Sequence, residues 1–135
     1  MKEADETAAL LEAVPGGREL LKWFSGAPNF GDAEIIAVHL DRVKPSTLVL
    51  EVQSRSGSAI VTLVLGDWID VSIRGFSHQN VIGGLLIRRA GEREIAPWEI
   101  GVGAIPGAVE IELKPIFGAC GIIRATLVSV AVQVA

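Results

Sequence analysis

The hydrophobic and polar positions of this chain follow two different periods. Residues 3–14 are rich in Ala, Leu and Glu, and residues 18–24 gather apolar side chains on one face, so both stretches favour short helices. Beyond residue 28, apolar side chains alternate with polar ones, which is typical of strands with one buried face. The pattern predicts a helical segment over residues 1–28 and a β portion over residues 29–135, together forming a single domain.

The alternating region divides into about eight strands separated by turn residues. We expect them at residues 36–41, 48–53, 60–65, 69–74, 81–89, 94–102, 109–113 and 122–134. Turns such as Gly66-Asp67 are too short for a parallel crossover, which needs about a dozen residues, so neighbouring strands run antiparallel. Gly83-Gly84 suggests a β-bulge, and Pro97 an edge position. The fold class is therefore α+β, mainly β: one or two short N-terminal helices followed by about eight antiparallel strands that form a strongly bent sheet or a sandwich.

Alternation also assigns faces to the strands. In the first strand it puts Ile36, Val38 and Leu40 on one face and His39 on the other. The last strand ends in a long uncharged run, so it is either central in the sheet or exposed at a subunit interface, and we favour the central position.

Composition limits the core and the partners. Hydrophobic residues make up 50% and aromatic residues only 5%, so the core must be built from Val, Ile, Leu and Ala. The net charge of -4 argues against nucleic acid as a partner, because phosphate neutralisation needs a basic surface. An acidic surface suits a basic protein partner, although so mild a charge is also ordinary.

Cysteine usage and hydropathy bear on location. Cys120 is the single cysteine, so the fold depends on no internal disulfide, and its apolar neighbours favour a buried structural thiol. The acidic N-terminus lacks an apolar signal core, and the apolar tail is too short to span a membrane. We therefore expect a cytoplasmic protein with no membrane partner.

Two polar clusters carry the candidate chemistry. Asp32 and Glu34 lie at the start of the first strand, on one face by period two, where they could serve acid–base chemistry, bind a hard cation, contact a partner or simply be solvated. His78, Gln79 and Asn80 form either a turn stabilised by Asn80, a residue type favoured at positive φ, or a recognition loop.

Catalytic and cofactor signatures are weak. A metal site would need His39 and His78 together with Asp32 or Glu34, and two histidines without regular ligand spacing disfavour it. No glycine-rich phosphate loop opens a helix, and no serine has a nucleophile-elbow context. We expect no enzyme, no metal and no cofactor.

Several short motifs, in their order and spacing, resemble the immunity protein 50 family of bacterial polymorphic toxin systems. The resemblance covers residues 20–134. It is carried by Trp23-Phe24, Asn29-Phe30-Gly31-Asp32-Ala33-Glu34-Ile35, Leu40-Asp41-Arg42, Pro45-Ser46-Thr47-Leu48, Gly75-Phe76-Ser77-His78-Gln79-Asn80-Val81-Ile82 and a closing strand that starts at Gly121. The family usually has His immediately before Asp-Ala-Glu, where this chain has Gly31, which indicates divergence or a different partner.

The resemblance implies a non-enzymatic protein that binds and neutralises a cognate toxin in the cytoplasm. Trp23 or Phe30 would then be apolar anchors of the interface. They would be surrounded by Asp32, Glu34, His78, Gln79 and Asn80, provided that the two polar motifs lie near each other. Two alternatives remain: a small-molecule-binding or enzymatic β domain that uses Asp32, Glu34, His39 and His78, or a structural homo-oligomer such as a homodimer built on the last strand.

Overall fold

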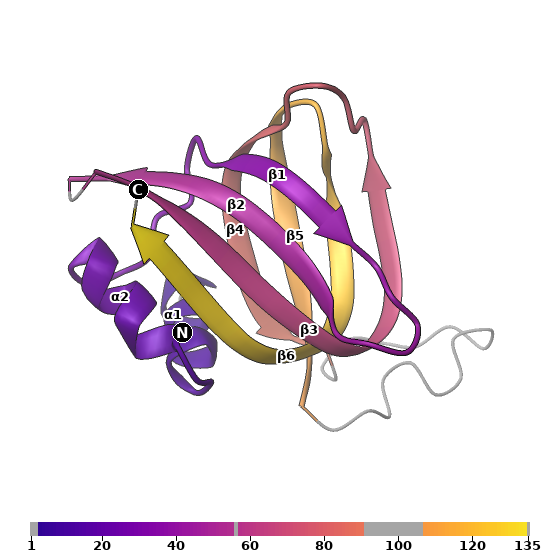
Figure 1. Ribbon diagram of the computed structural model, residues 1–135, viewed down its shortest axis with the longest axis horizontal. Helices are drawn as coiled ribbons and strands as arrows, with labels where there is room; N and C mark the ends of the chain where they lie inside the picture. The colour runs from indigo at the N-terminus through magenta and orange to yellow at the C-terminus, as the bar shows by residue number, and fades with distance from the viewer. Residues whose placement is uncertain (1–2, 56, 91–106, 135) are drawn as a thin grey trace.

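The computed structural model describes residues 3–55, 57–90 and 107–134 (Figure 1). These residues form two helices and six antiparallel strands: α1 (Glu3–Glu12), α2 (Gly17–Phe24), β1 (Glu34–His39), β2 (Ser46–Ser54), β3 (Gly57–Arg74), β4 (Val81–Arg89), β5 (Ala108–Phe117) and β6 (Cys120–Val134). The strands close into a barrel in the order β1-β2-β3-β6-β5-β4. The fold class predicted from the sequence is confirmed, because short helices precede an antiparallel sheet that bends until it closes.

The strand boundaries differ from the prediction at β3. The expected turn at Gly66-Asp67 was wrong, because the strands expected at 60–65 and 69–74 are one continuous strand. The pairing of β3 with β6 changes register between Gly66 and Asp70, so the glycine marks an irregularity inside a strand. The strand expected at 94–102, with Pro97, lies outside the described residues.

A β-bulge changes the predicted faces of β1. The register of β1 against β2 shifts between Ile35 and Ala37, which makes Ile36 the extra residue. Ile35 is therefore buried, whereas Ile36 is 50% exposed and Leu40, beyond the strand end, is also exposed. The prediction that Ile36, Val38 and Leu40 share one strand face was wrong, because Ile36 is the bulged residue and Leu40 lies beyond the end of β1. The bulge predicted near Gly83-Gly84 in β4 is confirmed by register shifts there.

The interior is almost wholly aliphatic, as the composition predicts. Its largest fully buried side chains are Leu11, Leu20, Leu48, Leu50, Leu63, Leu65, Ile82, Ile87, Ile111, Leu113, Ile123 and Val52. The two leucines at the start of this set come from α1 and α2, so the helices and the barrel share one core. Burying one such side chain contributes about 1.5–3 kcal/mol, which makes this core the main source of stability.

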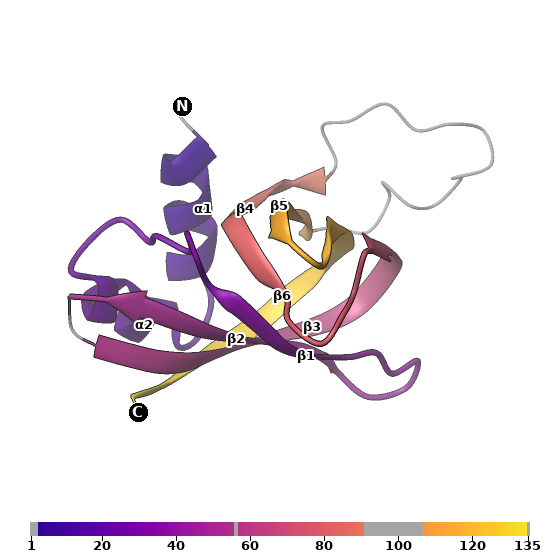
Figure 2. The ribbon, with the colours of Figure 1, turned by 90° about the horizontal axis from the view of Figure 1, so that it is seen from above.

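The barrel has a weak seam between β1 and β4. These strands pair through a single residue couple, Glu34 with Val81. Further along β4, helix α1 lies against the strand (Figure 2). There the hydroxyl of Thr7 accepts a hydrogen bond from the amide of Ile87 at 2.9 Å and donates one to its carbonyl at 3.3 Å. The helix therefore supplies hydrogen-bond partners to a part of β4 that does not pair with β1.

The last strand is central, as expected. β6 pairs with β3 along most of its length and with β5 on its other side. Among the described residues, neither helix has the length and apolar character needed to cross a membrane.

Candidate functional site

The two polar motifs of the sequence are neighbours in space. The amide of Asp32 donates to the carbonyl of Ile82 at 3.0 Å, and the amide of Ile82 donates to the carbonyl of Ala33 at 2.9 Å. The amide of Ile35 donates to the carbonyl of Asn80 at 2.8 Å. Backbone hydrogen bonds therefore join the segments 29–35 and 75–82 at one end of the barrel.

The first motif is a turn that projects Asp32. The side-chain oxygen of Asn29 accepts from the amide of Gly31 at 2.9 Å, and the amide of Ala33 donates to the carbonyl of Phe30 at 3.0 Å. Asp32 has φ of 64°, a left-handed conformation that is uncommon outside glycine. It is exposed and precedes β1, whereas Glu34 is half-buried within β1. Asp32 therefore lies outside the strand, so the period-two argument applies only from Glu34 onward.

The second motif is a loop held from inside by Asn80. Its side-chain oxygen accepts from the amides of Ser77 at 2.8 Å and Ala119 at 3.0 Å, and its side-chain nitrogen donates to the carbonyl of Ser77 at 2.8 Å. Asn80 is only 3% exposed, so it stabilises the turn and its side chain is not available to a partner. Its φ is not positive, so it acts through its side chain and not through a left-handed backbone. His78 and Gln79 point outward and are exposed.

The hairpin between β5 and β6 packs directly against this loop. Gly118 has φ of 80°, and a Cβ there would lie 2.4 Å from the carbonyl oxygen of Gln79 and 2.6 Å from the side-chain oxygen of Asn80. Only glycine allows this approach. Three segments distant in sequence therefore meet at one end of the barrel.

This end exposes three large apolar side chains. Phe76 is 54% exposed, Ile116 59% and Phe117 53%, and Phe117 pairs with Val81 at the start of β4. Sequence reasoning missed them as contact residues. The available signal was a pair of phenylalanines beside turn glycines, in a chain that has only four. Exposed apolar side chains gathered beside polar groups are typical of interaction surfaces.

The aromatic anchors expected from the sequence are packed inside. Phe30 is buried, and its ring meets that of Phe24 edge-on at 5.4 Å. The ring of Phe24 meets that of Trp23 at 5.0 Å, and Trp23 is partly buried against the core. Burial removes Phe30 and Asn80 from the candidate contact residues, and Trp23 serves mainly in packing.

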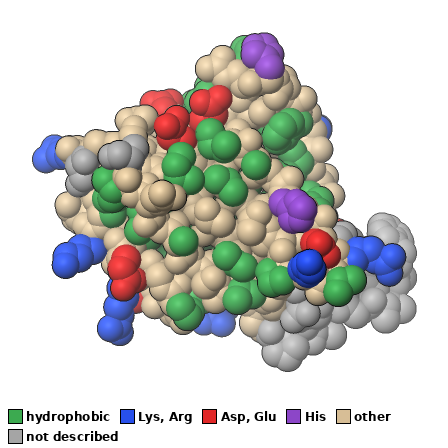
Figure 3. All heavy atoms as spheres, viewed as in Figure 1, with side chains coloured by type: hydrophobic (Ala, Val, Ile, Leu, Met, Phe, Trp, Pro, Cys, Tyr) green, Lys and Arg blue, Asp and Glu red, His purple; other side chains and the backbone are tan. Residues whose placement is uncertain are grey.

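Glu34 has an acidic neighbour that the sequence could not reveal. The register of β1 against β2 places Glu34 directly opposite Glu51. Like charges in this position destabilise a sheet, so the pair raises the free energy of the folded protein while concentrating negative charge near Asp32. In Figure 3, acidic side chains gather at the upper margin of the viewed face.

His39, one of the four residues of the enzymatic alternative, lies away from the barrel end that carries the other three. Glu34 and His39 are the two ends of β1, roughly 16 Å apart along the strand. His39 is exposed and lies 3.9 Å from Asp41. Within the described ranges, no group of three or more His, Cys, Asp and Glu residues could hold a metal ion.

Two hollows of the described surface lie elsewhere. One, of about 270 Å³, lies between the end of α2 and the β2–β3 hairpin and is lined by residues that include Phe24, Asn29 and Arg55. The other, of about 300 Å³, is lined by residues that include Asp70, Arg74 and Arg124. Neither contains Asp32, Glu34, His39 or His78.

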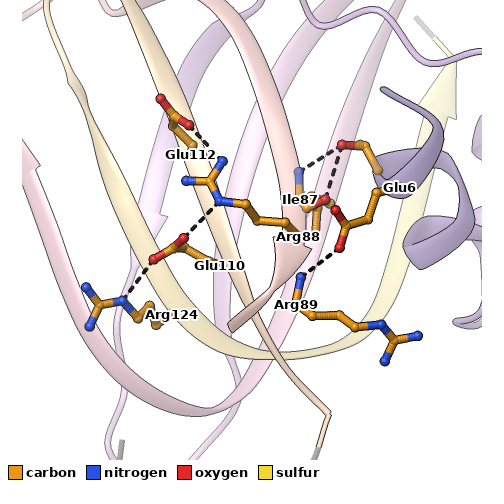
Figure 4. A network of polar contacts seen from close by, with 8 residues as sticks. Glu6, Ile87, Arg88, Arg89, Glu110, Glu112 and Arg124 are labelled. Carbon is orange, nitrogen blue, oxygen red and sulfur yellow. Dashed lines mark hydrogen bonds and ion pairs between the residues drawn. The ribbon is translucent and has the colours of Figure 1, made fainter. Parts of the chain in front are cut away.

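A chain of ion pairs crosses the outside of the barrel. Arg124 contacts Asp70 at 2.7 Å. It also contacts Glu110 at 3.1 Å, and Arg88 contacts Glu110 at 2.9 Å and Glu112 at 2.8 Å (Figure 4). Burial raises the pKa of the Glu110 carboxyl, but hydrogen bonds from the two guanidinium groups outweigh this effect and hold the pKa below its ordinary value. The chain links β3, β6, β5 and β4, and its charges satisfy one another, so its role is structural.

Comparison with protein-family models, with curated proteins and with solved structures finds no match for this chain.

Proposed function

We propose that the protein is an immunity protein that binds and neutralises a cognate bacterial toxin domain in the cytoplasm. It does so through a barrel-end surface made of Asp32, Glu34, Phe76, His78, Gln79, Ile116 and Phe117. One observation carries this proposal: three segments far apart in sequence meet at one end of a rigid barrel and expose large apolar side chains beside charged and amide groups.

The composition of this surface supports protein binding. A typical interface has a few large apolar anchors at its centre and a polar rim that excludes water. Phe76, Ile116 and Phe117 supply the anchors, in place of the buried Phe30. His78 and Gln79 supply donors and acceptors beside them, because the bonds of Asn80 fix the loop without using either side chain.

Rigidity supports the same function. The loop that carries His78 is tied to β1 by backbone bonds and to the β5–β6 hairpin by Asn80. A preorganised surface loses little conformational entropy on binding, and that favours high affinity. Asp32 and Glu34, with Glu51 beside them, would attract a basic toxin surface and speed the encounter.

Binding to the toxin domain encoded beside this gene tests the proposal. We expect Phe76→Ala with Phe117→Ala to weaken binding at least about 30-fold, because removing two hot-spot side chains costs about 1–2 kcal/mol each. Asp32→Ala with Glu34→Ala should mainly slow association, and this effect should shrink as salt rises. Calorimetry and surface-binding kinetics measure the two effects.

Val43→Ala is the matched control, because Val43 is 91% exposed in the loop between β1 and β2, away from the barrel-end surface. It should leave affinity unchanged. Unaltered affinity in both double variants, with far-UV dichroism showing an intact fold, would remove this surface from the interface.

A further inference from the structure

A second exposed face lies on the outside of β1, β2, β3 and β6. Their registers place Ala37 opposite Val49, Val49 opposite Thr62, and Thr62 opposite Ala131, so one uncharged row crosses all four strands. Val49 and Thr62 alternate with the buried Leu50 and Leu63 and therefore face outward. This row is the centre of the face.

Larger apolar side chains flank the row. Ile60 and Val64 lie on either side of Thr62 along β3 and are half-buried. Ile36 and Val128 are the extra residues at two register shifts, and both are exposed. Bulges re-aim side chains, and here both direct a large apolar group into solvent. We call the set Ile36, Val49, Ile60, Val64 and Val128 the outer-face strip.

The charges on this face are divided between its two ends. Glu34, the first residue of β1, lies opposite Glu51 of β2. At the other end, the loop after β1 carries the exposed Arg42 and Lys44, while the carboxylate of Asp41 in that loop already accepts the amides of Val43 and Lys44. Figure 3 shows hydrophobic side chains across the middle of the viewed face, below the acidic side chains of its upper part. The strip therefore lies between an acidic end and a basic end.

We propose that the outer-face strip docks against the same strip of a second copy of this chain. When two such faces meet about a twofold axis that runs across the strands, the acidic end of each copy lies over the basic end of the other. The charge pattern is therefore complementary to itself. It also gives Glu34 and Glu51 a cationic partner, which accounts for a cross-strand carboxylate pair that costs stability in the monomer.

The size of the face sets the expected strength. Four strands about 4.8 Å apart and about six residues of each, rising about 3.3 Å per residue, give a footprint of roughly 400 Å² per copy. Two copies bury roughly 800 Å², about half of a standard interface. The dimer is therefore weak, with a dissociation constant on the order of tens of micromolar or higher.

Sedimentation velocity of the full chain over a wide concentration range, without toxin, tests the dimer. We expect a reversible shift from monomer to dimer as concentration rises. Glu51→Lys should weaken the dimer at least about tenfold, because a lysine then faces the basic end of the other copy. The same variant relieves the Glu34–Glu51 repulsion, so its fold should persist.

A charge swap distinguishes a second copy from other occupants. Adding Glu34→Lys, Arg42→Glu and Lys44→Glu to Glu51→Lys should restore the dimer, because the two ends then exchange their charges and each again meets its opposite. Glu12→Lys makes the same charge change on α1, outside the face, and should leave the dimer constant unchanged. A single monomeric species at every concentration, or an Ile36→Glu variant that dimerises as before, would overturn the proposal. Failure of the charge swap to restore the dimer would also overturn it. If Ile36→Glu lost toxin binding and the unaltered chain stayed monomeric, the outer-face strip would bind the toxin and not a second copy.

Discussion

At the scale of single residues, Asn80 decides the shape of the barrel-end surface. Its buried side chain makes three hydrogen bonds. Two of them come from the backbone amides of Ser77 and Ala119, which are far apart in sequence. A buried amide that loses its acceptor costs about 1–3 kcal/mol, which is more than the same bond contributes when formed. The outward positions of His78 and Gln79 therefore depend on the side chain of a neighbour that no partner can touch.

We predict that Asn80→Ala lowers the free energy of unfolding by about 2–4 kcal/mol, because the amides of Ser77 and Ala119 lose their acceptor. Urea denaturation measures the change. Gln79→Ala, one residue away and exposed, should change stability by less than about 0.5 kcal/mol. Equal effects in the two variants would contradict this account.

At the scale of elements, alternation predicted the existence of most strands but not their irregularities. The fold class, the central last strand and the bulge near Gly83 followed from the sequence. The bulge at Ile36 did not, because one extra residue reverses the faces of a strand and leaves composition unchanged. Gly66-Asp67 resembles a turn, and only the long partner strand β6, which pairs on both sides of it, keeps β3 continuous.

The ion pairs across β3, β6, β5 and β4 lock neighbouring strands in register. Glu110 is the shared member, because it accepts hydrogen bonds from both Arg88 and Arg124. Each arginine also contacts a second carboxylate, Glu112 for Arg88 and Asp70 for Arg124. When Glu110 is removed, each guanidinium still contacts one carboxylate. The lost stability should therefore come mainly from the hydrogen bonds to Glu110.

We predict that Glu110→Gln lowers the free energy of unfolding by about 1–3 kcal/mol at pH 7. The pKa of Glu110 is lower in the folded state than its ordinary value of 4.5, so its contribution is present above pH 4.5 and is lost as pH falls through the folded-state pKa. The difference between wild type and variant should therefore shrink below pH 4.5. Denaturation curves from pH 7 to pH 3 measure it, and a constant difference would contradict the prediction.

At the scale of the whole molecule, closure depends on a helix as well as on strands. β1 reaches β4 at one residue couple, and α1 covers the strand edge beyond it. Glu6 extends this cover, since its carboxylate accepts from the amide of Arg89 at 3.1 Å. The sequence predicted both helix and strand. It could not predict that the helix completes the barrel beside β4, because this depends on a contact between residues about eighty positions apart.

We predict that Thr7→Ala lowers the free energy of unfolding by about 1–3 kcal/mol and speeds hydrogen exchange at the amide of Ile87. Thr7→Ser keeps the hydroxyl and should preserve most of the protection. Native-state exchange measured by nuclear magnetic resonance distinguishes the two. Unchanged protection at Ile87 in Thr7→Ala would show that the strand edge is sealed in another way.

The candidate site could be predicted only in part for the same reason. Asp32, His78 and Gln79 are exposed and Glu34 is half-buried. Their proximity follows from the backbone bonds of Asp32 with Ile82 and of Ile35 with Asn80. Phe30 and Phe76 are the same residue type in similar polar surroundings, yet one is buried and the other exposed. Only the fold of the two loops decides between them.

The tight approach of Gly118 to Gln79 and Asn80 has a practical consequence. The loop is held by backbone contacts and by the side chain of Asn80, so the side chains at positions 78 and 79 do not contribute to its conformation. These two positions can be randomised while the barrel stays folded. The protein is therefore a small scaffold on which new target preferences can be selected.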